Sequence, residues 1–98
     1  MSNQKLTIIA EILAKQEKRE FVKNELLKLI KTTLKEEGCI NYDLHQDNQN
    51  ENLFLFYENW ESRELWQKHM NNKHIADYAK ATEDAVLDFK LYEMTPIC

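Results

Sequence analysis

The chain has 98 residues and a formal net charge of −4, with 43% hydrophobic and 31% charged residues. This length predicts a single domain with one modest core, which we place at about residues 5–94. The negative charge offers no broad attraction for a phosphate backbone, so we do not expect nucleic-acid binding. Gly38 is the only glycine, which excludes both the phosphate-binding P-loop and the dinucleotide-binding fingerprint.

The first half of the chain changes from a strand pattern to a helix pattern and back. Residues 6–13 (LTIIAEIL) are β-branched and apolar on both faces, which predicts a strand covered on two sides. From about residue 18 the apolar residues take helical spacing, and Gly38 suits the left-handed position just beyond the end of this helix. Residues 39–46 (CINYDLHQ) alternate again, with Tyr42 on their apolar side.

The second half begins with a polar turn and a second strand that is apolar on both faces. The turn DNQNEN leads into this strand, residues 53–60 (LFLFYENW). Ser62 can then cap a helix on its N-terminal side. The apolar stripe of this helix carries Leu65, Trp66, His69 and Met70.

Asn71 and Asn72 interrupt that helix, and a further helix begins at about residue 73. We expect residues 88–94 to form the last strand. The order β-α-β-β-α-β predicts a ferredoxin-like α+β fold, in which two split β-α-β halves share one antiparallel sheet. The further helix is expected to place Ile75, Ala79 and Val86 on one side.

The strand patterns also predict a homodimer. Helices can cover only one face of a four-stranded sheet, yet the first strand has Ile9 and Leu13 on one face and Ile8 and Ile12 on the other. Burying one such side chain is worth roughly 1.5–3 kcal/mol, so an open face would forfeit many kcal/mol. We therefore expect two copies to pack sheet against sheet around a two-fold axis.

The sequence favours a cytoplasmic protein without membrane contact. Its first residues lack the apolar region of a secretory signal, and no apolar run approaches the length of a membrane span. Cys39 and Cys98 have neither metal-binding nor redox spacing. They are typical of free thiols in a reducing compartment, although two cysteines could also pair.

Three segments, LKEEGCINYDLHQD, FLFYENWES and HMNNKHIADYAKA, resemble the antibiotic biosynthesis monooxygenase (ABM) family, and within it the small bacterial members of the quinol-monooxygenase type. The resemblance extends from about residue 5 to residue 94. It implies a dimeric α+β barrel with a pocket between the helices and the sheet. It also implies oxidation of a quinol or other small hydroxyaromatic substrate by O₂, without a metal, flavin or haem cofactor.

Other branches of the family leave alternatives open. Some relatives degrade haem, but they carry an asparagine in the first strand that is missing here. Others isomerise a phosphorylated signalling sugar, a function that requires a phosphate site. The cations near the expected pocket are few, namely Lys68, Lys73 and Lys80. A third possibility is a non-enzymatic dimeric protein that binds a small molecule.

Cofactor-free oxygenation requires a base with a pKa near neutrality, an aromatic slot and donors for an oxyanion. His69 is our candidate catalytic base because it lies on or beside the apolar stripe of its helix; the alternative is a core histidine. His74 could enter the pocket or cap a helix. Tyr78 lies one turn beyond His74, so both can point the same way as substrate-binding residues.

The strands supply the other substrate-binding candidates. Asn59 and Trp60 face opposite ways, so at most one of them can face the pocket without a bulge. Either Asn59 or Glu58 could orient a substrate hydroxyl group. Tyr42 could bring its hydroxyl group to the pocket floor, where a buried tyrosine needs a partner.

A metal site is not expected. His69 and His74 are five residues apart, which would separate their directions by about 140° on one helix, and the i,i+4 spacing of helical zinc ligands is missing. A site would need the Asn71–Asn72 break to bring His74 round, together with a third ligand such as His45 or Glu58.

Overall fold

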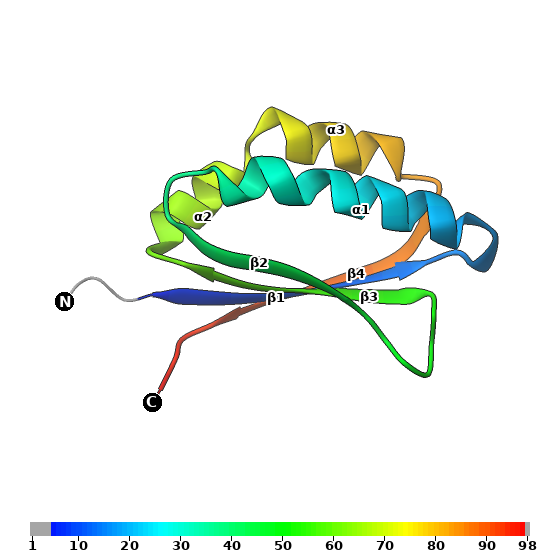
Figure 1. Cartoon of the computed structure of the whole chain (residues 1–98), viewed down its shortest axis with the longest axis horizontal. Helices are drawn as coiled ribbons and strands as arrows, with labels where there is room; N and C mark the ends of the chain where they lie inside the picture. The colour runs from blue at the N-terminus through cyan, green and yellow to red at the C-terminus, as the bar shows by residue number, and fades with distance from the viewer. Residues whose placement is uncertain (1–4, 98) are drawn as a thin grey trace.

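The computed structural model describes residues 5–97. Four strands form one antiparallel sheet in the order β2-β3-β1-β4, and the helices lie together on one side of it (Figure 1). This is the predicted ferredoxin-like α+β fold. None of the helices within residues 5–97 combines the length and the apolar character needed to cross a bilayer. The elements are β1 (Leu6–Ala14), η1 (Gln16–Lys18), α1 (Arg19–Leu34), β2 (Cys39–Gln46), β3 (Leu53–Trp60), α2 (Arg63–Met70), α3 (Lys73–Ala81) and β4 (Val86–Met94).

The sheet has a covered face, which lies under the helices, and an open face on the other side. In β1 every second residue is buried, so the strand alternates strictly between the two faces. The covered row of β1 consists of Leu6, Ile8, Ala10, Ile12 and Ala14, and its open row consists of Thr7, Ile9, Glu11 and Leu13. The predicted two apolar faces therefore exist, but only one of them is covered within the chain.

Helix α1 packs its apolar stripe on the covered face, as its spacing predicts. Its buried residues are Val22, Leu26, Leu29 and Thr33. The helix ends at Leu34, earlier than predicted, so Gly38 lies in the turn before β2 and is not a helix cap. Its φ of 88° still requires a glycine. A Cβ there would also clash with the Leu65 side chain, because this turn packs against α2.

The predicted break between α2 and α3 is confirmed, since α2 ends at Met70 and α3 begins at Lys73. Ser62 caps α2 as predicted, because its Oγ accepts a hydrogen bond from the Leu65 N–H at 3.2 Å. The prediction for Val86 was wrong. It begins β4, where it pairs with Ala14, since the helix stops at Ala81.

The open face carries an apolar patch next to a row of polar side chains. In the middle of the patch Ile9 pairs with Tyr57 on one side and with Tyr92 on the other. At the end of β3, Thr7 donates to Asn59 at 2.6 Å and Asn59 donates to Asn41 at 2.9 Å. The further apolar residues of this open-face patch are Leu13, Leu53, Leu55 and Met94.

Of the two cysteines, only Cys39 lies within the described residues. Cys39 is half-buried at the start of β2, and burial raises the pKa of its thiol to about 11. A raised pKa keeps the thiol protonated and unreactive at neutral pH. Cys98 lies outside the described residues.

Candidate functional site

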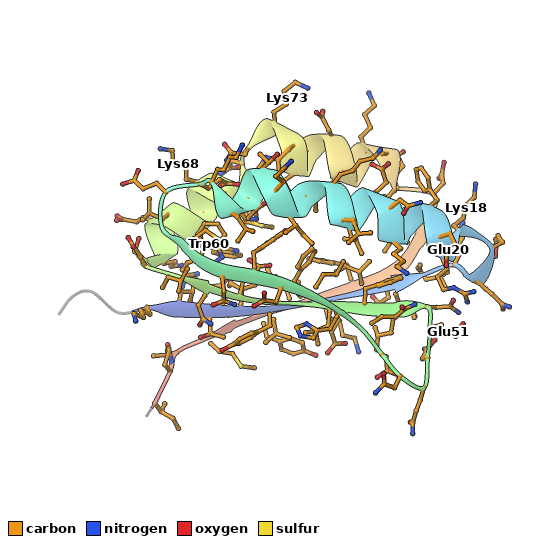
Figure 2. The ribbon with its side chains drawn as sticks, viewed as in Figure 1. Lys18, Glu20, Glu51, Trp60, Lys68 and Lys73 are labelled. Carbon is orange, nitrogen blue, oxygen red and sulfur yellow. The ribbon has the colours of Figure 1, made fainter. Side chains whose placement is uncertain are left out.

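A cavity of about 70 Å³ lies between the covered face and the helices. Figure 2 shows the side chains that fill this layer, with Trp60 at the end of the sheet beneath α2. Most of the cavity wall is aliphatic or aromatic, including Ala10, Leu26, Leu29, Phe56 and Leu91. The side chains of the wall that carry a nitrogen or oxygen atom are Tyr42 and Glu58 from the sheet and Trp66, His69 and Tyr78 from the helices.

His69 is held by one hydrogen bond. Its Nδ1 lies 2.9 Å from Glu36 Oε2, and only 2% of its side-chain surface is exposed. Because a carboxylate can only accept, Nδ1 carries the proton and Nε2 keeps its lone pair. Among residues 5–97, Nε2 makes no hydrogen bond. His69 therefore presents one unused acceptor nitrogen in a cavity wall.

Burial lowers the pKa of His69, and this effect outweighs the hydrogen bond and the negative charge of Glu36, which raise it. Nearby His74 lowers the pKa further. His69 is therefore neutral at pH 7, which is the form that can accept a proton.

Glu36 contacts side chains on both sides of the break between α2 and α3. It lies in the turn between α1 and β2, and its Oε2 is 2.9 Å from His69 Nδ1 and 3.1 Å from His74 Nε2. Its Oε1 accepts a hydrogen bond from Asn72 Nδ2 at 2.9 Å. The Asn71–Asn72 break thus has a purpose in this site, because it provides Asn72 and turns His74 toward Glu36.

The same cluster is where a metal ion would fit. Within residues 5–97, Glu36, His69 and His74 form the only group of three His, Cys, Asp or Glu side chains whose ligand atoms converge, all within 4.8 Å of one another. The break does bring His74 round, but the third member is Glu36 and not His45 or Glu58. Hydrogen bonds by themselves account for the arrangement, since a cation would have to replace the protons that now join these atoms.

Glu58 is a second titratable group in the cavity wall. It lies on the covered face beside Tyr42, and its residue surface is only 4% exposed. Its Oε1 accepts a hydrogen bond from Trp60 Nε1 at 2.9 Å. Burial raises the pKa of Glu58 to about 7, with a smaller contribution from Glu36, and the Trp60 hydrogen bond only partly opposes this rise.

Two of the predicted substrate-binding residues line the cavity. Tyr42 stacks on Phe56 with ring centroids 4.3 Å apart and meets the His69 ring edge-on at 5.5 Å. Burial, and then the charge of Glu58, hold the pKa of Tyr42 well above its usual range. Tyr78 of α3 lies in the opposite wall, and burial likewise raises its pKa. Both phenols are therefore neutral donors at physiological pH.

The other predicted substrate-binding residues lie elsewhere. Trp60 is fully buried and packs on His69 at 4.7 Å between ring centroids, which makes it a support behind the cavity wall. His74 points to Glu36 and does not line the cavity. Asn59 is a correction, because it belongs to the polar row of the open face, and Glu58 takes the inward position instead.

Trp66 is buried, as predicted for a core residue, but it also lines the cavity. Its Nε1 is buried and has no hydrogen-bond partner among the described residues. By contrast, Trp60 Nε1 is paired with Glu58. An unpaired indole N–H costs stability in a folded core, so Trp66 is a weak point of the packing.

A groove of about 470 Å³ adjoins the cavity on the side of α3 and β4. The groove and the cavity share Met70, Ile75, Tyr78 and Phe89 as lining residues. Met70 and Phe89 are also among the exposed large hydrophobic residues. The groove is therefore the natural entrance to the cavity, with Met70 and Phe89 at its inner end.

The family model described as antibiotic biosynthesis monooxygenase matches residues 5–81. The chain belongs to this family. It is similar to the "Probable quinol monooxygenase YgiN" of Escherichia coli K12, at 30% identity over 101 aligned residues that cover 93% of this chain and 97% of the relative. It is also similar to the uncharacterized protein YjcS of Bacillus subtilis, at 32% identity over 75 residues that cover 76% of this chain and 70% of YjcS.

Solved structures of similar chains agree with the fold of this ABM family member. The crystal structure of PA3566 from Pseudomonas aeruginosa superposes with a TM-score of 0.94 at 28% identity and covers 100% of this chain and 99% of that one. A second structure, Rv0793 from Mycobacterium tuberculosis, has a TM-score of 0.90 at 20% identity, covers 96% of each chain and supports the fold alone.

The three segments that resemble the family hold the main polar residues of the site. LKEEGCINYDLHQD carries Glu36 and Tyr42, FLFYENWES carries Glu58, and HMNNKHIADYAKA carries His69 and the break. Sequence reasoning missed Glu36 because it stands in a run of charged residues at a helix end, a pattern typical of a solvated turn. Its place inside a resembling segment was the one signal that could have drawn attention to it.

Proposed function

We propose that this ABM family member is a cofactor-independent monooxygenase that oxidises a small quinol or related hydroxyaromatic with O₂. One observation carries the proposal, namely an apolar cavity whose wall includes a buried, neutral histidine with no hydrogen bond to Nε2 from the described residues. Glu36 holds the other ring nitrogen and therefore orients the base, as a carboxylate does for the histidine of a catalytic triad. The family membership and the similarity to YgiN support this class of reaction.

The chemistry requires little else from the protein. His69 removes a hydroxyl proton, and the resulting aromatic anion is electron-rich enough to pass an electron to O₂. The two radicals then join through a new bond between a ring carbon and oxygen. For a hydroquinone the balance is quinol plus O₂ giving hydroxyquinone plus water, in which the O–O bond breaks, the ring loses four electrons and both oxygen atoms are fully reduced.

The size of the cavity limits the substrate. Its volume of about 70 Å³ is roughly half that of an engineered cavity that holds benzene. One aromatic ring therefore enters only when a lining side chain moves. Met70 and Phe89 are suited to this because they lie at the inner end of the groove and are exposed.

The wall of the cavity disfavours the alternative sugar isomerase. Among the described residues that line it there is no lysine or arginine, so a phosphate group would find no cation there. The non-enzymatic alternative predicts a structural role for His69 alone, and an activity measurement separates it from the monooxygenase.

We also propose that the protein acts as a homodimer through the open face. The patch formed by Ile9, Tyr57, Tyr92 and their apolar neighbours would otherwise remain in water, where it would favour aggregation. A two-fold axis lets the same patch cover itself on both copies. The cavity is lined from within one chain, so each subunit would contain its own site.

O₂ consumption tests the function directly. The protein is mixed with a panel of reduced benzoquinols and naphthoquinols, and O₂ uptake is compared with autoxidation in the absence of protein. We expect protein-dependent uptake and a hydroxylated quinone product, identified by mass spectrometry with ¹⁸O₂. Uptake that never exceeds autoxidation across the panel would reject a monooxygenase function.

A further inference from the structure

Glu58 has one more oxygen than its structural role requires. Its Oε1 accepts the hydrogen bond from Trp60 Nε1, whereas Oε2 makes no hydrogen bond to any residue within 5–97. A glutamine could accept the same bond without the cost of burying an ionisable group. A carboxyl oxygen without a partner in a mostly apolar cavity wall is a group that needs a donor, and the interior of the cavity is where a donor can arrive.

Glu58 and His69 act on the same cavity from opposite layers. Glu58 comes from β3 in the sheet and His69 from α2 above it. Trp60 touches both, because its N–H is bonded to Glu58 and its ring packs 4.7 Å from the His69 ring. Tyr42 likewise lies beside Glu58 in the sheet and 5.5 Å from the His69 ring. The two proton acceptors are therefore held by the same supporting side chains.

We propose that Glu58 is a second proton acceptor for the proposed quinol substrate, so that one hydroxyl group meets His69 Nε2 and the other meets the Glu58 carboxylate. This inference rests on the proposed monooxygenase function, to which it adds a specific residue that takes the second hydroxyl proton. A monophenol could engage only one of the two groups and would leave the other without a partner.

The two protons account for the water that the reaction releases. Conversion of the quinol to a hydroxyquinone removes both hydroxyl protons, one to His69 and one to Glu58. The hydrogen of the attacked ring carbon becomes the new hydroxyl proton of the product. When the O–O bond of the intermediate breaks, the departing oxygen needs two protons to leave as water, and His69 and Glu58 return the two that they took.

Several other titratable side chains lie near Glu58. Tyr42 from β2 pairs with Glu58 in the sheet, the charge of Glu36 from the turn after α1 raises the pKa of Glu58, and His69 from α2 lines the same cavity. The charge of Glu58 in turn raises the pKa values of Tyr42 and Cys39. Tyr42 and Cys39 remain protonated at neutral pH because their pKa values are raised. A change in ligand affinity centred near pH 7 is therefore expected to come from Glu58, whose pKa is about 7.

Binding without O₂ tests the inference separately from turnover. Hydroquinone and catechol are titrated into the protein under argon and compared with 4-fluorophenol, which has a similar shape but one hydroxyl group. Quenching of the tryptophan fluorescence reports binding, because Trp66 lines the cavity and Trp60 lies directly behind it. The titrations are repeated from pH 5.5 to 8.5 with the wild-type protein, with Glu58→Gln and with Glu61→Gln, an exposed control just beyond the end of the same strand.

In the wild-type protein at pH 8 we expect hydroquinone or catechol to bind about tenfold more tightly than 4-fluorophenol, the effect of one charge-assisted hydrogen bond. This preference should weaken as the pH falls through about 7. Glu58→Gln should reduce the preference to about threefold or less and remove its pH dependence, because a neutral amide forms a weaker bond and does not titrate. Glu61→Gln should behave as the wild type.

Three results would overturn the inference: no dihydroxy preference in the wild-type protein, the same preference and pH dependence in Glu58→Gln, or no binding of either class. The O₂ measurement distinguishes this from failure of the proposed function. A dihydroxy preference without O₂ uptake would support the two-point contact and reject the monooxygenase. Uptake without the preference would support the monooxygenase and reject the role of Glu58.

Discussion

The two faces of the sheet are built from the same strands and have opposite chemistry. Glu58 and Asn59 are neighbours in the sequence, yet Glu58 is buried in a cavity wall with a raised pKa, whereas Asn59 takes part in a polar row on the open face. The cause is the period of two in a strand, which sends adjacent side chains to opposite sides. A strand end can thus provide a reactive group and a surface group in consecutive positions.

The helices decide which of the two faces becomes a site. On the covered face they exclude water, so burial moves the pKa values of His69, Glu58 and Tyr42 in the directions that disfavour charge. On the open face, His45 and Asp43 show no comparable burial and remain at the surface. The contrast between the faces predicts that substitutions on the covered face change activity, whereas those on the open face change assembly.

The largest effect is expected from His69→Gln. Glutamine can still donate to Glu36 but cannot act as a base, so protein-dependent O₂ uptake should fall by roughly 10²–10⁴-fold, the usual contribution of a general base. His45→Gln on the open face is the matched control and should stay within about twofold. Circular dichroism checks that both variants are folded. If the His69→Gln variant keeps its activity, His69 is not the base.

The next largest effect is expected from Ile9→Asp on the open face. Ile9 pairs with Tyr57 and Tyr92 at the middle of the apolar patch, so Ile9→Asp would bury a carboxylate in the proposed interface. Loss of about 3 kcal/mol or more would weaken the dimer by over a hundredfold. Sedimentation velocity should then show a dimeric wild type and a monomeric variant at micromolar concentration.

The activity of Ile9→Asp separates the effect on assembly from the effect on catalysis. Because the cavity is lined from within one chain, O₂ uptake per subunit should fall less than that of His69→Gln. A wild-type protein that is monomeric at micromolar concentration would contradict the proposed interface.

Glu58→Gln should change the pH dependence of stability. The folded state raises the pKa of Glu58 from 4.5 to about 7, so its protonated form stabilises the protein below pH 4.5 and this contribution is lost as the pH rises through about 7. The loss amounts to about 3 kcal/mol for a shift of this size. Urea unfolding from pH 4.5 to 8 should show the variant gaining stability relative to the wild type as the pH rises. Parallel curves would mean that Glu58 ionises normally in the folded protein.

The smallest effect is expected at Asn59. Asn59→Ala removes the hydrogen bonds to Thr7 and Asn41 on the open face and should lower the free energy of unfolding by about 1 kcal/mol. O₂ uptake should remain within about twofold of the wild type. A loss of activity comparable with that of His69→Gln would show that the open face also contributes to activity.

The strands and the ends of α2 could be predicted because each depends on local patterns. The alternation in LFLFYENW matches β3, and Ser62 and the Asn71–Asn72 pair mark both ends of α2. Errors occurred where the pattern was ambiguous. Val86 fits the helical spacing of Ile75 and Ala79, but pairing with Ala14 draws it into β4.

Of the site, the sequence pointed to His69, Tyr42 and Tyr78 in the cavity wall. It named Glu58 only as an alternative to Asn59, and it did not point to Glu36. At a strand end with polar residues on both faces, the sequence alone does not show which side chains point inward, so Asn59 and Glu58 remained alternatives for the same role. Glu36 was missed because its value comes from partners that are 33 and 38 residues away along the chain. Such contacts arise only when the turn after α1 meets the break between α2 and α3.

The amino-acid sequence by itself determined the order of the elements, the two apolar rows of β1 and β3, and the family to which the chain belongs. These follow from side-chain periodicity, turn chemistry and local motifs, which act over a few residues. Only the tertiary structure decided which row the helices cover, and with it which acids are buried. Burial is a property of the packed chain, and burial converts Glu58 from an ordinary surface acid into one with a pKa of about 7.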